Sequence, residues 1–71
     1  MPQQTIKVLI NGESRELPTD QSVADLLRSL KVPYDRVAIE LNKAIVRKRD
    51  WEDTTVAAGS QIEIVEFVGG G

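Results

Sequence analysis

The sequence predicts an α+β fold in which a mixed sheet of four or five strands wraps over a single helix. A hairpin pattern opens the chain, one amphipathic helix follows it, and a nearly continuous apolar strand comes near its end. A strand–helix–strand crossover within one sheet is almost always right-handed. We therefore expect the first and last strands to be neighbours, with the last strand in the sheet interior.

The hairpin is predicted over residues 6–18. Apolar side chains recur at a period of two along residues 6–10, as in a half-buried strand. Asn11 and Gly12 follow, and this pair favours a type I′ turn because both central positions need positive φ. The returning strand is expected to end at Pro18, which has no N–H for a ladder hydrogen bond.

The helix is predicted to begin after Ser22, whose hydroxyl is suited to an N-cap, with the Asp25 carboxylate in the first turn. One apolar stripe follows at helical spacing, formed by Val23, Leu26, Leu27 and Leu30. We expect Val32-Pro33 to end the helix, because the residue before a proline is disfavoured in the α region.

Three further strands complete the prediction. Residues 37–41 alternate, and Asn42-Lys43 can turn the chain into a short strand at residues 44–46. Gly59-Ser60 predicts a turn before a last strand at residues 62–68, whose nearly continuous apolar residues place it at the sheet centre, buried against neighbours on both sides. This order of elements predicts the β-grasp, or ubiquitin-like, architecture. Its second sheet face has no helix to cover it and is a candidate partner surface.

Composition restricts the chemistry. The 71 residues include no Cys and no His, which excludes disulfides, thiolate nucleophiles, Cys/His zinc sites and imidazole catalysis. Nine basic against 11 acidic residues give a net charge of −2, so we do not expect a nucleic-acid partner. No apolar run approaches the ~20 residues of a membrane helix. With no secretory signal pattern either, we expect no membrane association and a cytoplasmic location.

The other charged residues are expected to lie on the solvated surface and not to form catalytic or metal-binding sites. Glu63 and Glu66 differ by an odd number of positions and should point to opposite faces. The segment 50–53, Asp-Trp-Glu-Asp, lacks the spacing of a Ca²⁺ loop, and we expect Trp51 to close the rim of the core. The run 47–49, Arg-Lys-Arg, suits a solvated edge or an acidic partner surface, and its role stays open. No glycine pattern cradles phosphate, so no bound cofactor is expected.

The last three residues carry the functional prediction. We expect residues 1–68 to form the domain, with Phe67 and Val68 anchored in it, and residues 69–71 to form a flexible tail. Glycine lacks Cβ, so the tail can pass through a slot too narrow for other residues, with a reach of roughly 10 Å. A carboxylate at Gly71 is a poor electrophile until a leaving group such as AMP is attached. In this interpretation the folded domain is a carrier that partner enzymes recognise, a handle for the tail, and not an enzyme.

A family resemblance gives this tail a role. The segments VAIELN (37–42) and VEFVGGG (65–71), with Trp51 and Gly59 between them, resemble ThiS, the thiamine-biosynthesis sulfur carrier family. The similarity spans nearly the whole chain, including the Asn11-Gly12 hairpin. It implies that an E1-like adenylyltransferase of the ThiF type uses ATP to adenylate Gly71. A sulfur-donor enzyme then supplies the sulfur of a thiocarboxylate, which a ThiG-type thiazole synthase receives.

The resemblance also implies roles for the neighbouring residues. Gly69 and Gly70 would thread into the partner's active site, and Phe67 and Val68 would contact the partner. Many relatives end in two glycines, so Gly69 is either spacer or contact. The alternatives are a molybdopterin synthase small subunit, another sulfur carrier for cysteine biosynthesis or tRNA, a protein modifier conjugated through Gly71, and a plain binding module.

Overall fold

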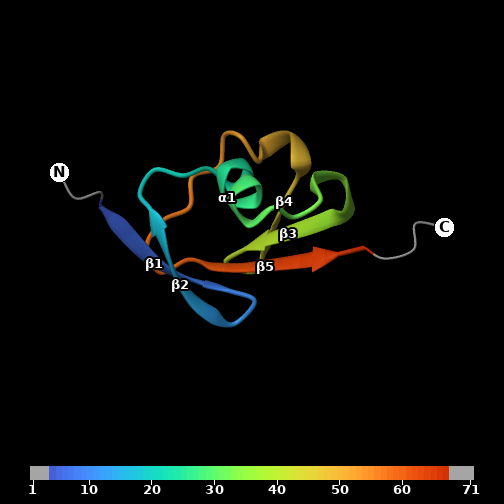
Figure 1. The fold of residues 1–71 in the computed structure, drawn as a ribbon. Coiled ribbons are helices and arrows are strands. Elements are labelled where there is room, and N and C mark those ends of the chain that lie inside the picture. Colours follow the sequence, from blue (N-terminus) through green and yellow to red (C-terminus); the bar gives the residue numbers. More distant parts are fainter. Residues whose placement is uncertain (1–3, 68–71) are drawn as a thin grey trace.

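A five-stranded mixed sheet carries one α-helix on one of its faces (Figure 1). The computed structural model describes residues 4–67. The strands and helix are β1 (Thr5–Ile10), β2 (Glu13–Pro18), α1 (Val23–Leu30), β3 (Val37–Leu41), β4 (Ala44–Val46) and β5 (Gln61–Glu66). Short 3₁₀ turns cover Tyr34–Arg36 and Lys48–Asp50. The predicted α+β, β-grasp architecture is confirmed.

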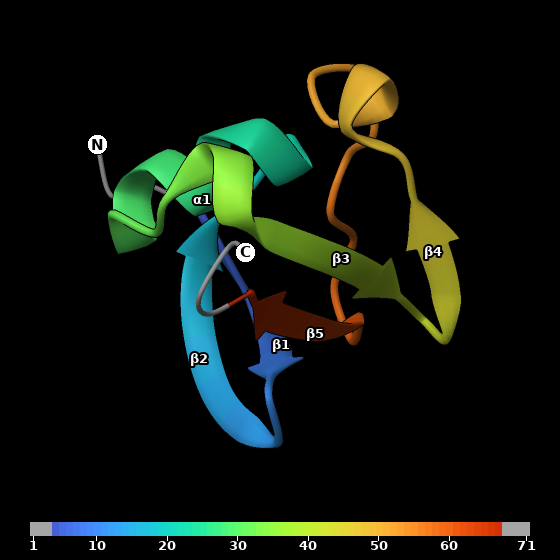
Figure 2. The same ribbon diagram turned by 90° about the vertical axis from the view of Figure 1, so that its right-hand side faces the viewer.

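The strand order is β2-β1-β5-β3-β4, so β5 lies in the middle of the sheet. It runs parallel to β1 and antiparallel to β3, while β2 and β4 form the two edges (Figure 2). The predicted adjacency of the first and last strands is therefore confirmed. The predicted place of β5 at the sheet centre, with neighbours on both sides, is confirmed as well. Among residues 4–67, α1 lies on the inner face only (Figure 1), and Val65 on the outer face is 56% exposed. The strand ends at Glu66 and not, as predicted, at Val68.

Two tight turns depend on residues with positive φ. Asn11 and Gly12 have φ values of 50° and 83°, which confirms the predicted type I′ hairpin. Asn42 and Lys43 repeat this geometry between β3 and β4, with φ values of 52° and 71°. Asn tolerates positive φ because its short polar side chain can hydrogen-bond to nearby backbone. The positions of both turns therefore follow directly from the sequence.

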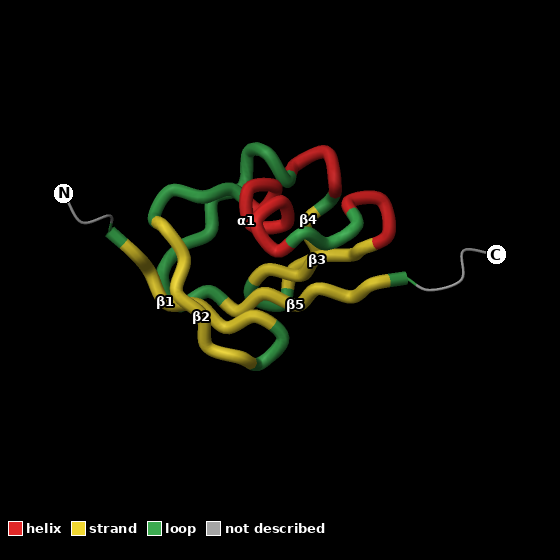
Figure 3. Tube along the Cα trace, viewed as in Figure 1, coloured by secondary structure: helices red, strands yellow, loops and turns green. Residues whose placement is uncertain are grey.

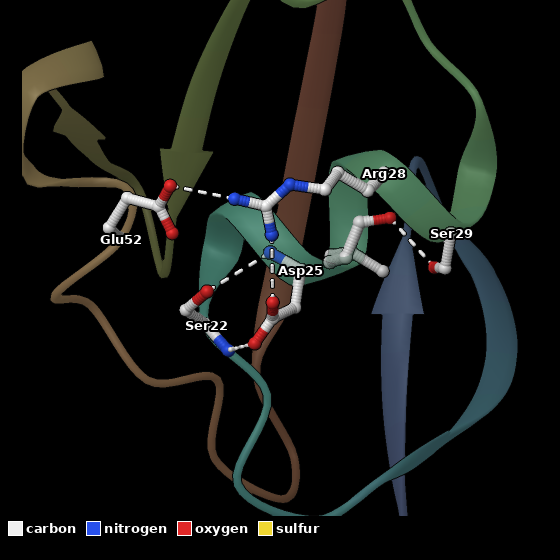
Figure 4. A network of polar contacts seen from close by, with 6 residues as sticks. Ser22, Asp25, Arg28, Ser29 and Glu52 are labelled. Atoms are coloured by element: carbon white, nitrogen blue, oxygen red, sulfur yellow. Dashed lines mark hydrogen bonds and ion pairs between the residues drawn. The ribbon is translucent and has the colours of Figure 1, made fainter.

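The predicted start of α1 after Ser22 is confirmed, but the helix ends earlier than the predicted stop at Val32-Pro33. The Ser22 hydroxyl accepts the Asp25 N–H at 3.0 Å, and the Asp25 carboxylate accepts the Ser22 N–H at 3.1 Å (Figure 4). The helix stops at Leu30 because Lys31 takes a left-handed conformation with φ of 59°. The N–H of Lys31 then closes the last turn on the carbonyl of Arg28.

The core lies between α1 and the inner face of the sheet, where the helices and loops gather (Figure 3). Its largest fully buried side chains are Trp51, Leu26, Leu27, Ile39, Ile62, Val23 and Val56. Trp51 is buried and packs against the core, as expected. Its ring contacts the Tyr34 ring edge to face, with 5.0 Å between the two ring centroids. Within residues 4–67, no helix combines the length and apolar character needed to cross a bilayer.

Candidate functional site: the exit of β5

The strand β5 carries the chain from the core to its last residues, and β3 holds it along that whole path. Val65 pairs with Ala38, and Glu66 pairs with Val37. The N–H of Phe67 then donates to the carbonyl of Arg36 at 2.6 Å. On the β3 side, the backbone of β5 is therefore hydrogen bonded up to the last residue that the structure describes.

Of the predicted site residues, only Phe67 lies within the described part of the chain. Phe67 is expected to anchor in the core or in the sheet, and it is attached to the sheet through its backbone, while its side chain is 55% exposed and lies outside the core. Its exposure leaves it accessible for the predicted partner contact. Val68, Gly69, Gly70 and Gly71 lie outside the described residues, so their roles, and the domain boundary at residue 68, stay predictions.

Two asparagine side chains hold β5, and sequence reasoning assigned both of them only to turns. Asn42 accepts the Gln61 N–H on its Oδ1 at 2.9 Å, where β5 begins. Asn11 accepts the Ile64 N–H on its Oδ1 at 2.8 Å and directs its Nδ2 at the Ile64 carbonyl at 3.3 Å, near the end of β5. The available signal was the choice of Asn, whose amide both donates and accepts, at these two turn positions.

The outer face of the sheet combines exposed apolar side chains with opposed carboxylates. Val65 and Phe67 are exposed at the end of β5, and Ile45 on β4 is 75% exposed. Between these groups, Glu40 lies directly opposite Glu63 in the β3–β5 ladder. Like charges placed opposite each other disfavour the sheet, and exposed apolar groups beside them are typical of an interaction surface.

A shallow hollow of about 270 Å³ opens on the inner face beside the end of β5. Its apolar residues are Ile10, Leu30, Val32 and Ile64. Glu66 also borders it, whereas Glu63 belongs to the outer face with Val65, so these two carboxylates do point to opposite faces as expected. Small-molecule sites usually occupy roughly 300–1,000 Å³, so the hollow is small for a cofactor.

A small network of ion pairs lies at the first turn of α1. Arg28 bridges Asp25 at 2.9 Å and Glu52 at 2.7 Å (Figure 4). Hydrogen bonds from the backbone and hydroxyl of Ser22, followed by the Arg28 charge, lower the pKa of Asp25. The hydrogen bond to Glu52 raises the pKa of Arg28. This network ties the first turn of α1 to the loop that holds Glu52.

The basic run is partly neutralised in the same way. Lys48 binds Asp35 and lies 5.6 Å from the centre of the Tyr34 ring, and its hydrogen bond lowers the pKa of Asp35. Arg49 lies 4.0 Å from Asp50. Across residues 4–67, no three acidic side chains come together as metal ligands would. The candidate site is therefore the exit of β5, meaning residues 64–67, where the strand ends, rather than the charged loop.

Comparison with known proteins shows the family of this chain. The model of the ThiS family matches residues 8–71. A thiazole synthase from Paramagnetospirillum magneticum is 41% identical over 66 residues, which are 93% of this chain but only 20% of that protein. The sulfur carrier protein ThiS of Bacillus subtilis is 35% identical over 63 residues, which cover 87% of this chain and 96% of that one.

A solved structure agrees with the fold. The crystal structure of the thiamine biosynthesis protein ThiS from Geobacter metallireducens superposes with a TM-score of 0.82 at 30% identity. The match covers 93% of this chain and all of that one. The family model includes both the β5 strand and the three glycines after it. The chain belongs to the ThiS family.

Proposed function

We propose that this chain is the sulfur carrier for thiazole formation in thiamine biosynthesis, and that Gly71 carries the sulfur as a thiocarboxylate. The observation that carries the proposal is the family match, which runs through residue 71 and so includes the three glycines. The sulfur carrier relative from B. subtilis supports it, because the match covers almost all of that protein.

The chemistry takes place at one carboxyl group. An oxygen of the Gly71 carboxylate attacks the α-phosphorus of ATP, pyrophosphate leaves, and an acyl-adenylate forms. Sulfur at the oxidation level of sulfide then attacks the acyl carbon, and AMP leaves with the original carboxylate oxygen. The product is a thiocarboxylate, and no net oxidation or reduction has occurred. Replacing oxygen by sulfur is unfavourable by itself, so cleavage of ATP must drive it.

The described residues contribute recognition and placement. The chain has no Cys or His to act as nucleophile or general base, which supports a role as carrier substrate rather than catalyst. Phe67 and Val65 offer exposed apolar area beside the β5 exit, where a partner that takes the tail would dock. In this proposal, an E1-like enzyme supplies ATP binding, a sulfur-donor enzyme supplies sulfur, and a thiazole synthase accepts it.

The synthase is the partner with the most direct support. A segment similar to 93% of this chain makes up 20% of the P. magneticum thiazole synthase. Physical linkage of a carrier-like segment to a synthase raises their effective concentration, which is useful if the two act in sequence. We propose that this chain makes the equivalent encounter with a thiazole synthase.

Intact mass spectrometry tests the proposal. The chain is incubated with ATP, an E1-like adenylyltransferase of the ThiF type and sulfide. We expect the mass to rise by the difference between one sulfur and one oxygen, with the change located at Gly71 by fragmentation. A chain made with Gly71 as its carboxamide is the matched control and should not react. Isopeptide adducts on lysines without any thiocarboxylate would instead support a protein modifier.

A further inference from the structure

We propose that Asn11 is a positioning residue for sulfur transfer, because its side chain fixes the direction in which β5 leads toward Gly71. The inference rests on the proposed function, since it concerns delivery of that carboxyl group to a partner. Asn11 itself lies in the hairpin turn and is separated from its contact on β5 by 53 positions.

The contacts of Asn11 with β5 lie just beyond the end of the β1–β5 ladder. The last paired residues of these two parallel strands are Ile10 and Ile62. The N–H of Asn11 still donates to the carbonyl of Ile62 at 2.8 Å, but the chain then turns away into β2. The side chain of Asn11 takes the place of the missing strand residue. It contacts both the N–H and the carbonyl of Ile64, at 2.8 Å and 3.3 Å.

Asparagine suits both tasks at this position. The turn needs a positive φ at the first central residue, and Asn tolerates that conformation better than most residues with a side chain. Its amide carries an acceptor oxygen beside an N–H donor, as a peptide group does, so it can replace one step of a ladder. Aspartate would keep the acceptor and lose the donor, and glycine would keep only the turn.

Beyond Ile64, the two sides of β5 differ. On the β3 side, pairing continues through Val65 and Glu66 to Phe67. On the β1 side, the shallow hollow borders Glu66, and within residues 4–67 Asn11 makes the last hydrogen bond to β5 on this side. Without Asn11, the end of β5 would be held from one side only and would pivot about β3.

The direction of exit matters because threading is a demanding geometric task. A tail that enters a narrow channel must leave the domain along the channel axis while the domain docks on its own surface. Any backbone freedom at residues 64–67 must then be lost on binding, at a cost for each residue that is ordered. We therefore expect Asn11 to affect the encounter with the partner, not the chemistry at the acyl carbon.

Asn42 provides a matched control. It has nearly the same φ as Asn11, and it too accepts a backbone N–H of β5, but at Gln61 where the strand begins. The experiment compares Asn11→Gly with Asn42→Gly, with both variants confirmed as fully folded under assay conditions. Amide hydrogen exchange at Ile64 and Glu66 is measured together with steady-state kinetics of adenylation, in which the carrier is the varied substrate.

For Asn11→Gly we expect exchange at Ile64 to speed up about tenfold and kcat/KM to fall about tenfold, mainly through a higher KM. Asn42→Gly should leave kcat/KM within about twofold of the wild type, although it loses a similar hydrogen bond. Asn11→Asp, which keeps the acceptor for the Ile64 N–H, should fall between the wild type and Asn11→Gly.

Two results would overturn the inference. One is an unchanged kcat/KM in Asn11→Gly while exchange at Ile64 accelerates. The other is equal impairment of Asn11→Gly and Asn42→Gly, which would reduce the effect to a general loss of sheet stability. Failure of the wild-type chain to accept AMP or sulfur would instead count against the proposed function, so the two failures are distinguishable.

Discussion

The indole N–H of Trp51 donates a hydrogen bond to the backbone carbonyl of Val46 at 2.9 Å. This bond joins the loop after β4 to the end of that strand, and Trp51 as a whole residue is only 2% exposed. The backbone carbonyl of Trp51 in turn accepts the N–H of Ala24 in the first turn of α1. One aromatic residue thus joins the loop, an edge strand and the helix.

We expect Trp51→Phe to lower the free energy of unfolding by about 2 kcal/mol, because it leaves a cavity and an unpaired Val46 carbonyl. Domains of this size have roughly 4–10 kcal/mol in total, so the loss should be easily measured by urea denaturation. Tyr34→Phe is the control, since it keeps the aromatic contact and should change stability by less than about 0.5 kcal/mol. Equal effects of the two variants would contradict this assignment.

Stability should fall in acid through Asp25. Because folding lowers the pKa of this carboxyl, its contribution is complete above the unfolded-state pKa of about 3.9. It is lost as the pH falls through the lower, folded-state pKa. Urea midpoints measured across this range should therefore depend less on pH in Asp25→Asn than in the wild type. Ser22→Ala keeps the backbone donor to Asp25 and should retain more of the dependence; an Asp25→Asn slope equal to the wild type would refute the linkage.

The opposed carboxylates of Glu40 and Glu63 should cost stability. We expect Glu63→Lys to stabilise the fold by about 0.5 kcal/mol, because an opposed like-charge pair becomes an attractive pair. Glu63→Gln removes only the repulsion and should lie between Glu63→Lys and the wild type. Thermal unfolding at low and high salt checks the cause, since screening should shrink both gains. A gain that does not depend on salt would argue against an electrostatic origin.

Removing Gly70 and Gly71 should abolish sulfur transfer and leave folding intact. Among residues 4–67, the buried core residues lie between Val8 and Ile62, so we expect the core to form without the last two glycines. The urea midpoint should match that of the full chain, while intact mass spectrometry should show no thiocarboxylate. Gly71→Ala keeps the length and the carboxylate, and should react more slowly if the partner's channel is narrow. Unfolding of the truncated chain would count against a separate handle and tail.

Phe67→Ala should weaken the complex with a ThiG-type thiazole synthase about tenfold and change stability by less than about 0.5 kcal/mol. The side chain is 55% exposed, so a large loss of affinity would reflect contact with the partner. Leu9→Ala is the control, because Leu9 is on the same sheet but pairs with Gln61 at the far end of β5. Titration calorimetry compares the two, and equal affinities would remove Phe67 from the interface.

Local physical chemistry was sufficient to predict most of the elements. The turn at Asn11-Gly12 and the cap at Ser22 depend on the conformations and hydrogen bonds of adjacent residues, which the sequence displays directly. The apolar stripe of α1 follows from helical periodicity. These signals predict a single helix packed on a sheet whose last strand lies inside it.

Contacts between distant segments decided the rest. The single helix predicts one uncovered sheet face, but the sequence does not reveal that Val65 and Phe67 are the side chains exposed at the end of β5. Nor does it reveal that the Asn11 side chain reaches Ile64, because that contact exists only once β1 and β5 are neighbours. Local propensity and composition were therefore enough to predict the elements, while the role of Gly71 as the reactive end stays a prediction. The contacts that hold β5 up to Phe67 come from residues far away along the chain, so they exist only in the folded arrangement.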